Sequence, residues 1–206
     1  MKRFISVSAL AFSTLMLSAC SILPEPEQLH VYRLPSTLSS TSSAATRSPM
    51  TLQINRPNSN QILDSSRIVV LPDGNQVSTY QGVRWSDRAP SILRDRLIDG
   101  FVNANRFAAV SSDDNHLHTD LQLVSSLRAF QSEYQNGAPQ VQIQLDAQLV
   151  GSQQQIIASK RFSISQAAAD ASVDNVVAAF GNAADALSAQ VLEWTVSQSS
   201  RAVKQP

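Results

Sequence analysis

The clearest pattern along the chain is an alternation of apolar and polar side chains over three successive segments. Residues 121–130 and 140–149 both alternate, and the Asn136-Gly137 pair between them is typical of a tight hairpin turn. Residues 156–165 form a third segment of this kind. The pattern predicts a β-meander with one solvated face and one apolar face, which another layer must cover. In this alternation Phe130 falls on the polar face.

Two other stretches have the three- and four-residue spacing of amphipathic helices. The longer one, residues 172–197, can begin at Ser172 as its N-cap. Its apolar face consists of Val173, Val176, Val177, Phe180, Ala184, Leu187, Val191 and Trp194. The shorter one follows Ser86 and Asp87, either of which can cap it, and has Pro90 in its first turn. Its apolar face consists of Ala89, Ile92, Leu93, Leu97 and Phe101.

Shorter apolar segments predict the remaining strands. They are residues 30–34, 50–56, 67–71, 76–80 and 107–110, with an Asp73-Gly74 turn between the third and the fourth. Because the helices must cover the apolar face of the sheet, the expected fold class is α+β. We expect a largely antiparallel or mixed sheet with two amphipathic helices packed on one face. A single domain would span residues 30–198, followed by a C-terminal tail over residues 199–206.

The amino terminus predicts a lipid anchor. Lys2 and Arg3 precede a short apolar run, which is typical of a secretory signal peptide over residues 1–19. The run ends in Leu17-Ser18-Ala19-Cys20, which resembles a bacterial lipobox and contains the only cysteine of the chain. We therefore expect a covalent lipid on Cys20. The alternative is an ordinary signal peptide whose cleavage site adjoins a cysteine.

Residues 20–29 comprise the lipidated cysteine and a short tether that contains two prolines. At about 3.1 Å per residue, an extended proline-rich segment of this length reaches roughly 28 Å, which keeps the domain close to its membrane. Ser21 is not the aspartate that retains bacterial lipoproteins at the inner membrane. By resemblance to that sorting rule, we expect the inner leaflet of the outer membrane, facing the periplasm.

The composition narrows the classes of function. The chain has 16 basic and 16 acidic residues and a formal net charge of zero, so nothing favours a nucleic-acid partner. It contains no Gly-x-Ser-x-Gly elbow, no glycine-rich phosphate loop and no His-Glu-x-x-His zinc motif. We therefore expect no enzymatic activity and no cofactor other than the covalent lipid.

Tyr80, Arg84 and Trp85 are the first candidates for a binding site. Tyrosine, arginine and tryptophan dominate the hot spots of protein interfaces, so this cluster predicts a partner-binding surface. The alternative, which we favour for Trp85, is packing in the core beneath the shorter helix.

Two further groups of residues are weaker candidates. His116, His118 and Asp120 share one face of a strand, with Asp113 and Asp114 just upstream, and such a set can ligate zinc. A closed zinc site needs four ligands and the remaining histidine, His30, is far away in sequence, so we favour a solvated strand entry. The glutamine-rich face of residues 140–148 is either a platform for a partner or for subunit contacts, or, by default, a solvated outer face.

The order of these features resembles the auxiliary lipoproteins of MCE-type ABC transport systems, and among them those of paraquat-inducible operons. The resemblance rests on the lipobox, on the motif Tyr32-Arg33-Leu34-Pro35, on residues 68–71, on Tyr80…Arg84-Trp85, and on the meander with its closing helix. It implies a non-catalytic component of an intermembrane phospholipid transport system. Such a component would dock an MCE-family tunnel protein at the outer membrane, and a homo-oligomer that matches a symmetric tunnel remains open.

Two competing functions come from other classes. A periplasmic lipid carrier would hold acyl chains between the sheet and the helices, and it predicts an apolar cavity of ligand size. An envelope hydrolase would need a polar catalytic cleft.

Overall fold

The structure, a computed structural model, describes residues 29–37, 47–115 and 117–202 of the chain. Its largest feature is a meander of three long strands: β7 (Leu121–Gln135), β8 (Ala138–Gly151) and β9 (Ile156–Ala167). β8 pairs antiparallel with β7 on one side and with β9 on the other, which confirms the predicted meander. Asn136 and Gly137 both have positive φ, as a tight hairpin turn requires.

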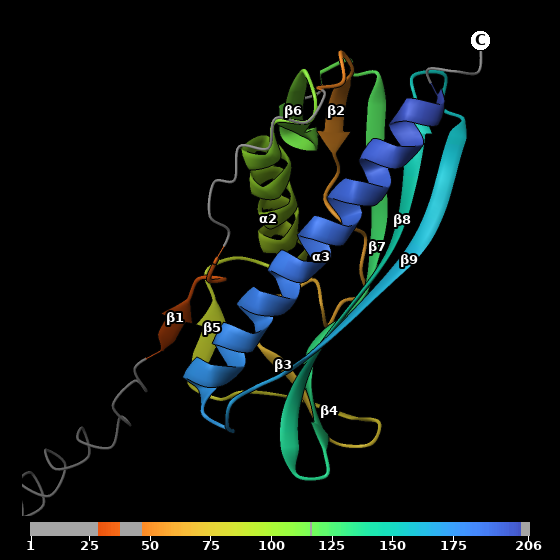
Figure 1. Ribbon diagram of the computed structural model, residues 1–206. Helices are drawn as coiled ribbons and strands as arrows, with labels where there is room; N and C mark the ends of the chain where they lie inside the picture. The colour runs from red at the N-terminus through yellow and green to blue at the C-terminus, as the bar shows by residue number, and fades with distance from the viewer. Residues whose placement is uncertain (1–28, 38–46, 116, 203–206) are drawn as a thin grey trace, which may run out of the picture.

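On the side of β7 that faces away from β8, two short strands pair with successive parts of β7. β2 (Thr51–Ile54) pairs in parallel with the start of β7, and β3 (Val69–Asp73) pairs in parallel with its far half. β6 (Ala109–Ser112) extends the sheet beyond β2, and β4 (Gln76–Thr79) extends it beyond β3. The four short strands confirm the sequence prediction, and the sheet is mixed (Figure 1).

A separate two-stranded sheet lies beside the start of the long helix. β1 (His30–Tyr32), which was predicted, pairs in parallel with β5 (Val83–Trp85), which was not. The Tyr32 hydroxyl donates a hydrogen bond of 2.8 Å to Asp174 in the first turn of that helix. The first described residues of the chain are therefore fastened to the far end of the fold from β2 and β6 (Figure 1).

Both helices lie on the same face of the sheet, as predicted (Figure 1). α2 (Ala89–Ala104) has Pro90 in its first turn, but neither Ser86 nor Asp87 caps it. Its N-cap is Arg88, which makes no capping bond with its side chain, so the predicted cap was wrong. A short turn, η1 (Asp113–Asn115), follows β6.

α3 (Val173–Ala202) begins where the sequence predicts and ends later than expected. The Ser172 hydroxyl accepts a hydrogen bond of 3.4 Å from the Asn175 amide, which confirms the N-cap. The helix continues past residue 197 to Ala202, into the segment expected to be a tail.

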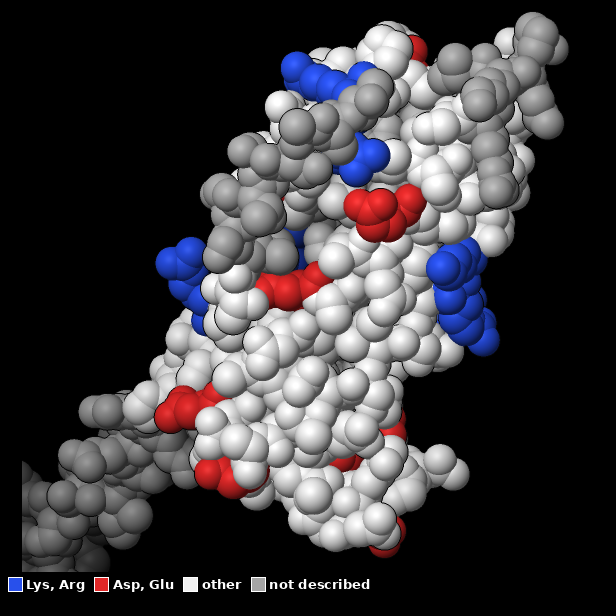
Figure 2. Space-filling view, in the orientation of Figure 1, with Lys and Arg blue, Asp and Glu red and all other residues white. Residues whose placement is uncertain are grey.

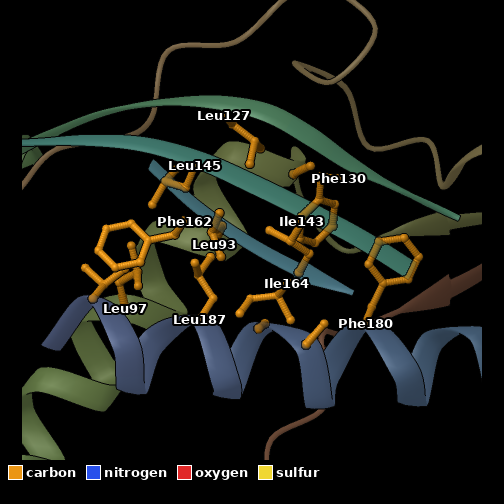
Figure 3. Packing of buried hydrophobic residues seen from close by; sticks show 14 of the residues in the cluster. Leu93, Leu97, Leu127, Phe130, Ile143, Leu145, Phe162, Ile164, Phe180 and Leu187 are labelled. Carbon is orange, nitrogen blue, oxygen red and sulfur yellow. The ribbon is translucent and has the colours of Figure 1, made fainter. Parts of the chain in front are cut away.

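One cluster of buried side chains fills the layer between the sheet and the helices (Figure 3). Leucines of α2 and Phe180 and Leu187 of α3 pack against the inner face of the meander. The labelled members of this cluster are Leu93, Leu97, Leu127, Phe130, Ile143, Leu145, Phe162, Ile164, Phe180 and Leu187. All ten are at most 8 % exposed.

The position of Phe130 corrects the predicted alternation. A β-bulge shifts the register of β7 against β8 between Leu127 and Ala129. The bulge adds Arg128 as an exposed extra residue, and every following side chain changes face. Phe130 therefore points into the core and is only 1 % exposed, instead of lying on the polar face.

Candidate functional site

Trp85, at the end of β5, lies in the core and is 0 % exposed. Its ring centroid is 6.0 Å from that of Phe130 and 5.2 Å from that of Phe180, and both contacts are edge-on. Phe130 belongs to β7 and Phe180 to α3, so the indole joins three separate elements. The sequence analysis favoured core packing, which the structure shows, but expected it beneath the shorter helix; the rings that the indole contacts belong to β7 and α3. A partner that binds the folded domain does not reach this side chain.

Tyr80 and Arg84 do not share a surface with Trp85. Tyr80 is half-buried, its hydroxyl lies 3.2 Å from the Ser132 hydroxyl, and burial raises the pKa of its phenol. Arg84 is exposed, because neighbouring residues of a strand point to opposite faces. The structure therefore separates the predicted cluster, and a partner-binding role for Arg84 stays a prediction.

The acidic residues near the predicted metal site are occupied by hydrogen bonds and ion pairs. Arg94 contacts Asp113 at 3.0 Å and Asp114 at 2.8 Å. Burial alone would raise the pKa of Asp113, but the hydrogen bonds from the Arg56 amide and from Arg94 outweigh it and lower that pKa. Asp120 accepts hydrogen bonds of 2.7 and 2.8 Å from the amide and hydroxyl of Thr51, which lower its pKa.

The histidines of that site do not complete a metal centre in the described part of the chain. His118 is exposed, and His116 lies outside the described residues. Within residues 29–37, 47–115 and 117–202, no three His, Cys, Asp or Glu residues are grouped so that they could hold a metal ion.

A buried ion pair fastens the amino-terminal segment to both helices, and sequence reasoning missed it. Arg96 of α2 and Asp185 of α3 approach to 3.2 Å, with side chains only 6 % and 9 % exposed. Arg96 also donates hydrogen bonds to the carbonyl oxygens of Leu34, at 2.9 Å, and Pro35. Asp185 accepts hydrogen bonds of 2.8 Å from both the amide and the hydroxyl of Thr37. We call these five residues the N-terminal clamp.

Gly181 allows the clamped segment to approach the long helix closely. A Cβ atom at this position would lie 2.7 Å from the Pro35 side chain and 2.8 Å from its carbonyl oxygen. These distances are too short for real Cβ contacts, so any other residue would push the segment off the helix. The glycine inside α3, which costs roughly 1 kcal/mol of helix propensity, is thereby explained.

A surface groove of about 640 Å³ lies between the loop over residues 61–67 and the edge strand β4. It is lined by Asp64 and Arg67 and by two exposed apolar side chains, Ile62 at 48 % and Val77 at 47 %. This groove was not predicted, because its two walls are irregular or short and carry no periodic pattern.

The outer face of the meander carries an exposed ion-pair triad. Asp146 of the glutamine-rich segment lies 2.9 Å from Arg128 and 2.5 Å from Arg161. The hydrogen bond from Arg161 is the main cause that lowers the pKa of Asp146 to about 2. Gln148 on the same face is exposed, and whether this face binds a partner stays a prediction.

The Asp146 triad predicts a pH-dependent contribution to stability. The pKa of Asp146 in the folded state, about 2, lies below the unfolded value of about 3.9, so its contribution is present above pH 4 and disappears as the pH falls toward 2. Asp146→Asn should therefore lower the free energy of unfolding at pH 6 and much less at pH 2, measured by urea denaturation. Arg161→Gln should behave in the same way. An Asp146→Asn effect of equal size at both pH values would contradict this assignment.

The matching family model identifies the class of this protein. The model of the ABC-type transport auxiliary lipoprotein component matches residues 32–192, from β1 to the last turns of α3. The chain therefore belongs to the family of ABC-type transport auxiliary lipoproteins, as its sequence features suggested. Cys20 lies outside both the matched and the described residues, so its lipidation stays a prediction.

The chain is also similar to proteins of known sequence or structure whose descriptions name no function. Protein XCC0632 from Xanthomonas campestris is 25 % identical, with a TM-score of 0.78 over 85 % of this chain and 99 % of that one. Another solved structure, of an uncharacterized protein, has a TM-score of 0.63 at 16 % identity over 81 % of this chain and 98 % of that one, and shows the fold alone.

An uncharacterized protein of Bradyrhizobium diazoefficiens is 27 % identical over 145 residues, which are 70 % of this chain. The match spans only 39 % of that relative's own length.

Neither α2 nor α3, the helices of the described residues, has the length and apolarity needed to cross a bilayer. Figure 2 shows that most of the face crossed by α3 is uncharged and that its charged side chains are scattered. This face therefore offers no large field of one sign that would attract a highly charged partner.

Proposed function

We propose that this protein docks an MCE-family tunnel protein at the outer membrane, as a non-catalytic component of an intermembrane phospholipid transport system. The observation that carries the proposal is the family match over residues 32–192, because members of this family are auxiliary components of ABC-type transport. The resemblance of the motifs to the lipoproteins of MCE systems narrows the partner to a tunnel protein.

The proposed lipid on Cys20 and the short tether support this position. The tether keeps the folded body within roughly 28 Å of the membrane that holds the lipid. β1 and the N-terminal clamp keep the connection from lengthening, since residues 30–32 pair with β5 and residues 34–37 are bonded to both helices. A tunnel that ends at the outer membrane would thus meet the body of this protein at the membrane surface.

The alternative function, a lipid carrier, is less well supported. It requires space for acyl chains between the sheet and the helices. The side chains of this layer are closely packed instead: Leu145, Phe162 and Leu187 are each at most 1 % exposed (Figure 3). An acyl chain would have to displace this core.

Affinity purification tests the proposal directly. The lipidated protein, extracted from membranes in mild detergent, should co-purify with the MCE-family protein of the same bacterium, and chemical crosslinks should join the two. Absence of both co-purification and crosslinks, with the protein correctly anchored in the outer membrane, would overturn the docking role. Phospholipid bound to the purified protein, detected by mass spectrometry without any MCE partner, would favour the carrier.

The oligomeric state is a separate question. A ring that matches a symmetric tunnel predicts a light-scattering mass of several protomers, and a mass of one protomer would count against the ring. The docking role does not depend on this result, since a single copy can also bind a tunnel.

A further inference from the structure

The outer face of the β1–β5 sheet combines exposed apolar and basic side chains next to the tether. In parallel strands, paired residues lie on the same face, and Val31 pairs with Arg84. Leu29 and Arg33 are two residues to either side of Val31 along the extended segment. Leu29 is 53 % exposed and Val31 is 51 % exposed, and both arginines are exposed. We call these four residues the anchor-side patch.

The inner face of the same small sheet is attached to the body, so the patch has a fixed direction. Tyr32 bonds to Asp174 of α3, and Trp85 is buried in the core. The patch therefore lies on the side of the small sheet that faces away from the core, and it follows directly after the tether.

We propose that the anchor-side patch rests on the surface of an anionic phospholipid membrane and orients the domain there. The half-exposed side chains of Leu29 and Val31 can insert between the lipid headgroups, while the guanidinium groups of the two arginines pair with lipid phosphates. Only the eight residues 21–28 separate Cys20 from Leu29, so the patch stays within reach of the bilayer that holds the lipid. The proposal rests on the lipid anchor of the proposed function, but it does not require an MCE partner.

The two arginines of the patch should contribute unequally to membrane binding, because only one of them lines a groove with two acidic residues. Asp95 and Asp99 of α2 line a shallow groove together with Arg33, and Asp95 is also paired with Arg94 at 3.0 Å. Their negative charge offsets part of the attraction between Arg33 and an anionic surface. Arg84 does not line that groove, so its removal should weaken membrane binding more.

Vesicle binding of the unlipidated mature chain tests the patch without the anchor. Residues 20–206 with Cys20→Ser should bind vesicles of phosphatidylglycerol more tightly than vesicles of phosphatidylcholine. Each basic residue at an anionic surface contributes up to about fivefold, so Arg33→Gln with Arg84→Gln should weaken binding by at most roughly 25-fold, with Arg84→Gln the larger single loss. Leu29→Ser with Val31→Ser should weaken it as well. The control pair Ile62→Ser with Val77→Ser, at similar exposure elsewhere, should leave binding unchanged.

A fluorescent label locates the patch in the anchored protein. Cys20 is the only cysteine, so once it is acylated, an introduced cysteine is the only free thiol. An environment-sensitive dye on Val31→Cys should shift its emission to the blue and be protected from iodide in proteoliposomes. The same dye on Val77→Cys, a valine of nearly equal exposure, should show neither effect. If the intact mass shows two dye labels, Cys20 was not acylated. That result would contradict the lipid anchor of the proposed function, and it would leave the patch to be judged by the vesicle binding of the unlipidated chain.

Three results would overturn the proposal. The first is equal iodide access at positions 31 and 77, and the second is equal vesicle binding by patch and control variants. The third is an Arg84→Gln variant that loses the tunnel protein in affinity purification while its vesicle binding is unchanged, because this would assign Arg84 to a protein partner.

Discussion

Replacing Asp185 by alanine should lower the free energy of unfolding by about 3–5 kcal/mol, because the change leaves a buried charge without its partner. The Arg96 side chain, 6 % exposed, would stay in the core opposite the new alanine. The amide and hydroxyl of Thr37 would lose their acceptor at the same time. Urea denaturation at neutral pH, followed by circular dichroism, measures the loss.

A double variant separates the charge from the packing. Arg96→Met with Asp185→Leu removes both charges and fills a similar volume, so it should recover much of the stability that Asp185→Ala loses. Asp99→Ala on the exposed face of α2 should change stability by no more than about 0.5 kcal/mol. A loss of less than about 1 kcal/mol for Asp185→Ala would mean that the N-terminal clamp does not hold the fold together.

Replacing Trp85 by alanine should cost a similar 3–5 kcal/mol, because it removes the largest fully buried side chain and leaves a cavity between three elements. Phe130 and Phe180 would lose their edge-on contacts with the indole. Thermal unfolding and urea denaturation should both report the loss. Trp85→Phe keeps an aromatic ring in the same place and should lose less.

The Trp85→Phe variant also tests where a partner binds. Since the indole is buried, the folded variant should capture a tunnel protein as well as the parent chain does. Weaker capture by Trp85→Phe with unchanged stability would show that Trp85 belongs to the partner-binding surface after all.

The sequence predicts the long, periodic elements most clearly, and it also predicts the short strands β1, β2, β3, β4 and β6. β7, β8, β9 and α3 repeat their pattern often enough for the period to be unambiguous. β5 has only three residues, which is too few to show an alternation. The bulge at Arg128 was missed for a different reason: an extra residue in one strand becomes visible only against the register of its neighbour.

The N-terminal clamp was missed because its partners are far apart in sequence. Thr37 and Asp185 are separated by 148 residues, and no local pattern connects them. A partial indication existed, since Arg96 and Asp185 are charged residues next to the apolar faces of two predicted helices. Charged residues at such positions are almost never fully buried unless they are paired. Each of the two therefore indicated an oppositely charged neighbour, but the sequence does not show which residue that is.

The N-terminal clamp also limits how far the chain would extend if the proposed partner pulled the domain away from the proposed anchor. A force along the proposed tether would reach β1 first, and β1 is held by three residue pairs with β5 and by the hydrogen bond from Tyr32 to Asp174. Separation of β1 from β5 would free residues 29–33. It would stop at Leu34, which is hydrogen-bonded to the buried pair formed by Arg96 of α2 and Asp185 of α3. At about 3.3 Å per extended residue, the five freed residues should lengthen the tether by roughly 17 Å while the large sheet and both helices stay intact.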